Sequence, residues 1–310
     1  FPYTTLFRSI DLVKNARLIA CSSKDRAKAA DFKEKYGLEF SGSYEEMLSR
    51  PDIDAVYIAT THNFHYENAM LCLKYGKNIL CEKAFTVNAM QAEEIFTEAA
   101  KKKLFVMEAM WARFLPAAAW VREQVRNNAI GDVISIFAQY GVRIPFDPSS
   151  RAYDSRLAGG GLLDLGIYPL SFSCSILGND PAEVYGTAVI GKTGVDEEAT
   201  AALMYSNGQT AVISYSMLRD GRNNAVIYGS RGKIFIDSAC APTRAVLVGE
   251  TGSEIVYESI GSNGFEHEIA EATDLILKSE TESSVINGKD TTGILKICDS
   301  LRKQWEETIL

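Results

Sequence analysis

Several features that would mark a metalloprotein or a secreted protein are missing from this 310-residue sequence. Its six cysteines are scattered without a CxxC pair, which favours a reducing cytoplasm over a disulfide framework. His62 and His65 have no third candidate ligand nearby, so no metal site is expected. These absences predict a cytoplasmic protein without a metal.

Basic stretches and long apolar runs are also scarce. The net charge is −8 and no basic stripe compensates it, so broad electrostatic binding to nucleic acid is not expected. No apolar run approaches the roughly 20 residues that span a bilayer, which predicts a soluble protein without a membrane partner. With 46% hydrophobic residues, the chain can build the cores of two domains.

The first nine residues, Phe1 to Ser9, show no helical or strand period. They read like one frame of a cloning adapter, and we interpret 1–9 as non-native residues joined to a native chain that begins near Ile10. A disordered natural terminus is the alternative interpretation.

From residue 10 to about 112, apolar strands alternate with helical patterns, as in a parallel sheet covered on both faces. The expected strands cover residues 17–22, 55–59, 78–81 and 104–107. Such a dinucleotide-binding domain normally opens with a strand and a GxGxxG turn, and neither is found here. Roughly 20 residues that hold the first strand and turn are therefore expected to be missing, which would impair cofactor binding.

Residues 113–290 have a different rhythm, with short strand-like runs joined by turn signals such as Ser206-Asn207-Gly208. This pattern predicts a second domain on an open, mainly antiparallel sheet, followed by a C-terminal helix over 291–310. The overall fold class is therefore α/β plus α+β. An uncovered apolar sheet face is costly in water, so the second domain also favours a homodimer.

Two reactive side chains stand out, Lys83 where an apolar strand ends and Tyr168 on a helix that follows Gly159 to Gly161. A buried lysine beside a phenol can hold the phenol nearer its ionised form, which makes a proton carrier for alcohol or carbonyl chemistry. Asp164 lies four residues before Tyr168 and so on the same helix face. The plainer alternatives are a solvated lysine, a core tyrosine and a helix N-terminal charge. For the glycines we prefer close approach to a substrate or nicotinamide.

With these pieces assembled, the chain resembles the glucose-fructose oxidoreductase, inositol dehydrogenase and MocA (Gfo/Idh/MocA) family. Within it, the sequence is most similar to dimeric dihydrodiol dehydrogenases and NADP-dependent D-xylose dehydrogenases. The resemblance covers about residues 10 to 305 and rests on five segments: Gly42-Ser43-Tyr44-Glu45-Glu46, Val56-Tyr57-Ile58-Ala59-Thr60, Cys81-Glu82-Lys83, residues 107–114 and the glycine-rich run ending at Tyr168.

The resemblance implies that Lys83 bonds the substrate hydroxyl and the nicotinamide ribose, that Asp164 orients substrate, and that Tyr168 exchanges the proton. It also implies a set of cofactor-binding residues: Ser23, Lys24, Thr60, Asn63, His65, Glu82, Lys83 and Arg113. Trp111 and Arg151 would line the substrate site, although a structural aromatic and a surface salt bridge are equally ordinary readings of Trp111 and Arg113.

The strand before Ser23 and Lys24 has no acid at its tip, so hydroxyls and a cation would meet the ribose 2′-phosphate. This favours NADP, with NAD as the alternative. The predicted function is an NADP-dependent dehydrogenase that acts on a hydroxyl of a sugar or a trans-dihydrodiol. The alternative is a catalytically inert dinucleotide-binding regulator or scaffold of the same fold.

Overall fold

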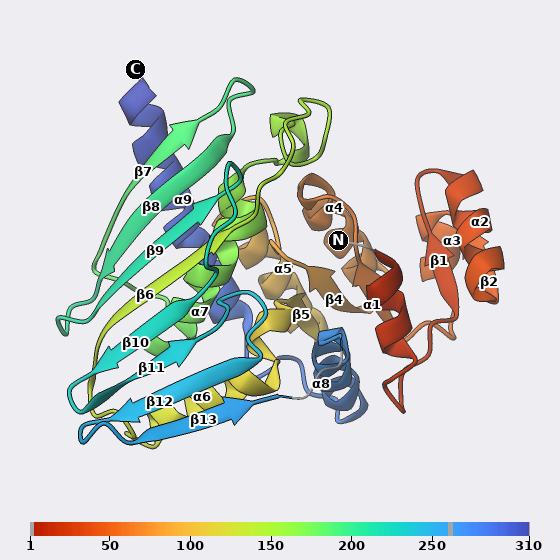
Figure 1. The fold of residues 1–310 in the computed structure, drawn as a ribbon. Coiled ribbons are helices and arrows are strands. Elements are labelled where there is room, and N and C mark those ends of the chain that lie inside the picture. The colour runs from red at the N-terminus through yellow and green to blue at the C-terminus, as the bar shows by residue number, and fades with distance from the viewer. Residues whose placement is uncertain (1–2, 260–262, 310) are drawn as a thin grey trace.

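The computed structural model describes residues 3–259 and 263–309, and it confirms a Rossmann-like parallel part followed by a mainly antiparallel sheet (Figure 1). All strands of the N-terminal part that pair do so in parallel. They are β1 (Ala20–Ser22), β2 (Phe40–Gly42), β3 (Ala55–Ile58), β4 (Asn78–Glu82) and β5 (Val106–Ala109). The helices between them are α2 (Arg26–Tyr36), α3 (Tyr44–Leu48), α4 (His65–Lys74) and α5 (Ala89–Lys102).

Local sequence signals explain where these helices begin and end. The Asp25 side chain accepts the first free amides of α2, and Gly37 ends that helix in the left-handed conformation. Asn88 caps α5 by accepting from the Gln91 amide. Short caps of this kind fix the lengths of the helices and therefore the points at which the strands end.

The parallel strands form two separate sheets, β1-β2 and β3-β4-β5. In the doubly wound order, the first strand of the fold lies between the strands that correspond here to β1 and β3. The break between the two sheets therefore falls where the first strand lies in that order.

Helix α1 (Tyr3–Ile10) lies between the two groups of parallel strands (Figure 1). The Phe7 ring packs edge-on against Phe32 of α2 at 4.6 Å, and the Ser9 hydroxyl bonds the Asn263 side chain at 2.7 Å. Residues 3–9 thus belong to a helix although their sequence shows no helical period, because contacts with distant segments stabilise the helix there.

The second domain is built on an eight-stranded sheet in the order β13-β12-β11-β10-β6-β9-β8-β7. Its pairs are antiparallel except for β6 and β9. The strands are β6 (Val133–Gly141), β7 (Glu183–Ile190), β8 (Asp196–Met204), β9 (Thr210–Ser216), β10 (Ala225–Gly229), β11 (Gly232–Ile236), β12 (Arg244–Gly249) and β13 (Glu254–Glu258). The sequence did not predict β7 and β13, because both are edge strands in which many apolar side chains stay exposed.

Helices cover one face of this sheet and leave the other face open (Figure 1). The covering helices are α6 (Pro116–Arg126), α7 (Ile167–Leu177) and α9 (Gly288–Ile309). Helix α8 (Phe265–Leu277), which the sequence did not predict, lies near α1 instead. The C-terminal helix begins three residues before the predicted residue 291.

One helical stretch, Ser155–Leu177, is long and apolar enough to cross a membrane by length and composition alone. The expectation that no run approaches this length is therefore wrong. In the structure, 83% of the most apolar window is buried inside the protein, as in the core helix of a soluble protein. Packing against the sheet accounts for its apolar composition.

Candidate active site

Lys83 follows the last residue of β4 and is almost fully buried, with 6% of its surface exposed. Its ammonium group donates to the backbone carbonyl of Asp164 at 2.7 Å and to the carboxylate Oδ1 of Asp164 at 3.1 Å. The same nitrogen lies 4.8 Å from the centre of the Tyr168 ring. The fold thus joins three residues that the sequence proposed as one site.

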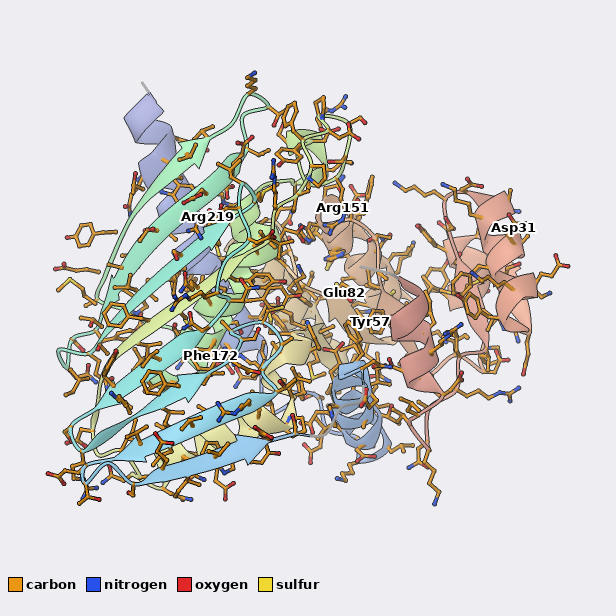
Figure 2. All side chains as sticks on the ribbon, in the orientation of Figure 1. Asp31, Tyr57, Glu82, Arg151, Phe172 and Arg219 are labelled. Carbon is orange, nitrogen blue, oxygen red and sulfur yellow. The ribbon has the colours of Figure 1, made fainter. Side chains whose placement is uncertain are left out.

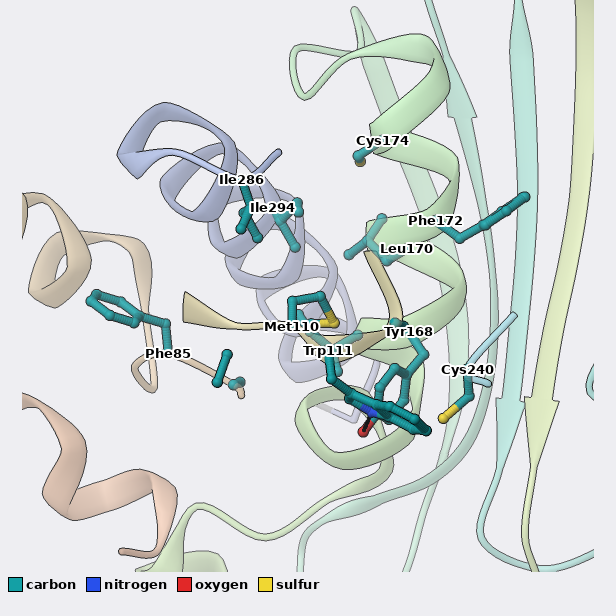
Figure 3. Packing of buried hydrophobic residues seen from close by; sticks show 14 of the residues in the cluster. Phe85, Met110, Trp111, Tyr168, Leu170, Phe172, Cys174, Cys240, Ile286 and Ile294 are labelled. Carbon is teal, nitrogen blue, oxygen red and sulfur yellow. Dashed lines mark hydrogen bonds between the residues drawn. The ribbon is translucent and has the colours of Figure 1, made fainter. Parts of the chain in front are cut away.

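Tyr168 is buried in the first turn of α7, and its hydroxyl accepts a hydrogen bond from the Trp111 indole at 3.2 Å. Figure 3 shows Trp111, Tyr168 and Cys240 close together. Burial first, and the Cys240 thiol second, raise the pKa of Tyr168 well above its usual value, and the Trp111 bond offsets this only in part.

The expectation that Lys83 holds Tyr168 nearer its ionised form is therefore wrong. The lysine ammonium faces the ring of Tyr168 and donates its hydrogen bonds to Asp164. No hydrogen bond from Lys83 to the phenolic oxygen is found among the described residues. Without that bond, burial dominates and keeps the phenol protonated.

The Asp164 carboxylate forms ion pairs with two cationic side chains. Its Oδ1 accepts from Lys83 and, at 3.2 Å, from Arg151, whose side chain is 40% exposed at the edge of the cluster. Burial alone would raise the pKa of the Asp164 carboxyl, but the charges of Lys83 and Arg151 outweigh it and hold the pKa well below its usual range. Asp164 is therefore a carboxylate under all ordinary conditions.

A π-helical turn, η4 (Leu162–Gly166), carries Asp164 directly before α7. Pro169 explains its position: proline has no amide to bond the carbonyl of Leu165 four residues earlier, and its ring would clash with that carbonyl. Widening of the helix by one residue relieves the clash. The carbonyl of Asp164 instead receives the Lys83 ammonium.

The glycines around this turn approach two side chains of the sheet. A Cβ at Gly160 would come within 2.5 Å of the Asp196 carboxylate, and one at Gly161 or Gly166 within 2.5 Å of the Tyr215 ring. Gly160 and Gly161 thus approach β8 and β9, whereas a Cβ at Gly159 would come within 2.8 Å of the Arg151 and Ala152 carbonyls. Close approach of this run to a substrate or nicotinamide stays a prediction.

His62 also belongs to the cluster, since the charges of Lys83, Asp164 and Arg151 act on its imidazole. Its sequence position had suggested only a weak metal ligand. It lies in η1 (His62–Phe64) after β3 and is 7% exposed. Burial lowers the pKa of His62 to about 3, and the positive charge of Lys83 acts in the same direction. A neutral imidazole thus lies near Lys83 and Asp164. Its place after a parallel strand is the signal that could have found it.

His65 joins the ends of two neighbouring strands. One ring nitrogen lies 2.9 Å from the carbonyl of Ala84, and the other lies 2.9 Å from the carbonyl of Thr60. The Thr60 hydroxyl accepts from the Asn68 side chain at 3.1 Å. His65 is fully buried, so these contacts hold the loop after β3 against the loop after β4.

Three of the predicted cofactor residues lie at the carboxyl ends of β1 and β3. The Lys24 ammonium lies 3.6 Å from the centre of the Phe64 ring, so the two ends meet across the break in the sheet. The Ser23 hydroxyl accepts from the Asp25 amide at 3.2 Å, and the Asn63 side chain accepts from Thr61 at 2.7 Å. This edge is where open parallel sheets bind ligands.

Glu82 precedes Lys83 and is held from two sides. Its carboxylate accepts from the Tyr57 hydroxyl at 2.8 Å and from the Lys83 amide at 3.2 Å. Burial raises the pKa of Glu82, while the bond from Tyr57 opposes this shift. Figure 2 shows Tyr57 and Glu82 side by side, with Arg151 above them.

Arg113 lies outside the cluster. Its guanidinium is buried and donates to the Ser171 hydroxyl at 2.9 Å and to the Val285 carbonyl at 3.2 Å. These contacts tie α7 to the segment before α9, and they are those of a structural residue. Within residues 3–259 and 263–309, no group of three His, Cys, Asp or Glu side chains could hold a metal ion.

Comparisons with known proteins agree with this architecture. The profile of an oxidoreductase family with an NAD-binding Rossmann fold matches residues 6–110, and that of a Gfo/Idh/MocA C-terminal domain matches residues 119–235. A trans-1,2-dihydrobenzene-1,2-diol dehydrogenase of Xenopus tropicalis is 34% identical over 93% of this chain and 89% of its own length. That of Mus musculus is 32% identical over 97% of this chain and 92% of its own.

Two solved structures share the fold. An aldose-aldose oxidoreductase from Caulobacter crescentus, complexed with glycerol, superposes with a TM-score of 0.90 over 98% of this chain and 94% of its own, at 22% identity. A 3-ketoreductase from Actinomadura kijaniata in complex with NADP gives a TM-score of 0.85 over 97% and 93%, at 23% identity.

Proposed function

The chain belongs to the Gfo/Idh/MocA oxidoreductase family, and on this premise we propose that it is an NADP-dependent dehydrogenase of a sugar or diol hydroxyl. The curated relatives named as dihydrodiol dehydrogenases support the substrate class. The observation that carries the proposal is the buried cluster of Lys83, Asp164 and Tyr168. A catalytic role explains why the fold places an ammonium, a carboxylate and a phenol together.

The donor groups at the sheet edge fit one end of NADP. Ser23 and Lys24 would hold the ribose 2′-phosphate, since the nearby Asp25 carboxylate is engaged by the amides of Ala27 and Lys28. Glu82 and Lys83 would lie at the nicotinamide end. A nicotinamide cofactor supplies hydride donation or acceptance.

The residues of the cluster would transfer the proton, stabilise charge and position the reacting groups. Tyr168 accepts from Trp111, so its own hydroxyl proton is available for a substrate oxygen during carbonyl reduction, and the oxidation returns a proton to it. Lys83 stabilises the negative charge that develops on that oxygen. Asp164 holds the ammonium in place, and Arg151 balances the charge of Asp164.

The test of this proposal is Tyr168→Phe. At saturating NADP(H), we expect turnover of sugars or diols to fall about 100-fold or more, because the proton carrier is lost. Cofactor affinity should stay within about twofold, since the phenolic oxygen bonds Trp111 and not Ser23, Lys24 or Asn63. The matched control is Tyr205→Phe, which removes a buried tyrosine hydroxyl that bonds the Gly178 carbonyl beyond the other end of α7.

Equal turnover in Tyr168→Phe and the unchanged protein would refute the assignment. Tight NADPH binding with no turnover of any sugar or diol would instead favour an inert regulator of the same fold.

We further propose that a second copy of the chain covers the open sheet face. One row of apolar side chains crosses all eight strands in register. The row runs Tyr185, Ala202, Val212, Phe137, Val226, Phe235, Val246 and Val256. Uncharged Ser135 and Gln139 flank Phe137 at its centre. A two-fold axis near this centre would pack the apolar row of one copy against the same row of the other copy, as in symmetric homodimers.

A further inference from the structure

The N-terminal end of η4 has no cap from its own segment. Gly161 occupies the cap position and has no side chain to accept the free amides of the turn. The Leu162 amide instead donates to the Asp196 carboxylate at 2.6 Å, across 34 residues of sequence. The negative charge of this carboxylate also interacts favourably with the positive end of the helix dipole.

Tyr215 supports the same turn from β9. Its hydroxyl donates to the Asp196 carboxylate at 2.6 Å, so one carboxylate oxygen receives both bonds. Opposite edges of the Tyr215 ring face Gly161 and Gly166, where a Cβ would come within 2.5 Å of the ring. The ring therefore fits under both ends of the turn.

Asp164 lies between these two contact points, and its bonds to Lys83 reach both its backbone carbonyl and its side chain. Displacement of the turn would therefore move both acceptors of the Lys83 ammonium. We infer that Asp196 and Tyr215 are positioning residues that fix the π-helical turn and, through it, the Lys83–Asp164 pair. Neither residue touches the cluster of Lys83, Asp164 and Tyr168 through any of its hydrogen bonds found here.

The charge state of Asp196 sets the conditions of the test. Burial raises the pKa of Asp196 to about 6, while the bonds from Tyr215 and Leu162 and the charge of Arg302 act against this shift. Measurements at pH 8 therefore keep Asp196 ionised, with its two hydrogen bonds at full strength.

The kinetic test rests on the proposed function and compares two tyrosines. Tyr215→Phe keeps the ring under the turn and removes the bond to Asp196, so kcat should fall about tenfold while KM stays within about twofold. Tyr205→Phe removes an equivalent buried bond at Gly178, and kcat should stay within about twofold. Asp196→Asn, which keeps one acceptor oxygen, should retain more kcat than Asp196→Ala.

A second readout is independent of activity. Hydrogen exchange of the amides in residues 160–168 should speed up about tenfold in Tyr215→Phe, and should be unchanged in Tyr205→Phe. If both variants exchange this segment at the same rate and lose kcat equally, Asp196 and Tyr215 are ordinary packing residues and the inference is overturned. If no variant or parent turns over substrate, the proposed function fails, and exchange alone decides the inference.

Discussion

Lys83 and Lys77 show how one residue type takes two roles at opposite ends of β4. Both are buried, at 6% and 8% exposure. Lys77 donates to the backbone carbonyls of Arg50 and Ile53, whereas Lys83 donates to Asp164. Lys83 forms a direct ion pair with the buried Asp164 carboxylate, whereas the bonds of Lys77 go to backbone carbonyls and its charge acts only at a distance on the Asp52 carboxylate.

This contrast gives a prediction with a built-in control. Lys83→Met should lower turnover about 100-fold and destabilise the protein by about 3 kcal/mol, because a buried carboxylate loses its partner. Lys77→Met should cost about 1–2 kcal/mol through its two lost carbonyl bonds and leave turnover within about twofold. Denaturant unfolding and steady-state kinetics measure both effects. Equal turnover in the two variants would remove Lys83 from the mechanism.

At the scale of elements, the turn η4 decides where the reactive groups point. The π-helical turn contains Asp164, and Pro169 follows it four residues after Leu165. Its packing depends on glycine, because the Tyr215 ring occupies the space that a side chain would need.

Gly166→Ala tests this dependence on close packing. The added methyl group would meet the Tyr215 ring, so we expect a loss of about 1–3 kcal/mol in the free energy of unfolding, together with reduced turnover. Gly249→Ala is the control, since a Cβ there would come within 3 Å only of the Ser253 hydroxyl, at 2.9 Å, and that side chain can rotate away. A Gly166→Ala protein as stable and active as the control would contradict the packing argument.

At the scale of the whole molecule, two features go beyond any single element. One is the break in the parallel sheet, where α1 lies between β1 and β3. The other is the open face of the eight-stranded sheet, where Phe137 and Phe235 are 49% and 37% exposed. The first bears on how well the cofactor is held, and the second on assembly.

The proposed homodimer predicts the effect of a charge on the open face. Phe137→Asp at the centre of the apolar row should convert a dimer to a monomer, because a buried unpaired carboxylate costs several kcal/mol. Leu277→Asp places the same charge at a residue that is 65% exposed on α8, and should leave the dimer intact. Sedimentation at several concentrations separates these outcomes. A parent protein that is monomeric at all concentrations would end this proposal.

Much of the fold followed from local patterns. The alternation of apolar strands and helices predicted the parallel part, and residues with local capping preferences, Asn88 and Gly37, lie at the observed helix ends. Edge strands β7 and β13 were missed because exposed apolar residues blur the two-residue period. Helix α1 was missed because tertiary contacts, such as that of Phe7 with Phe32, stabilise it.

Local sequence patterns were enough to identify the groups that could react, since Lys83 follows a strand and Asp164 and Tyr168 share one helical segment. The effect of these groups on one another depends on how the chain folds. Lys83 reaches Asp164 across 81 residues, burial raises the pKa of Tyr168, and His62 joins the cluster. The physical reason is that hydrogen bonding and desolvation depend on distances between remote segments, which no local pattern encodes.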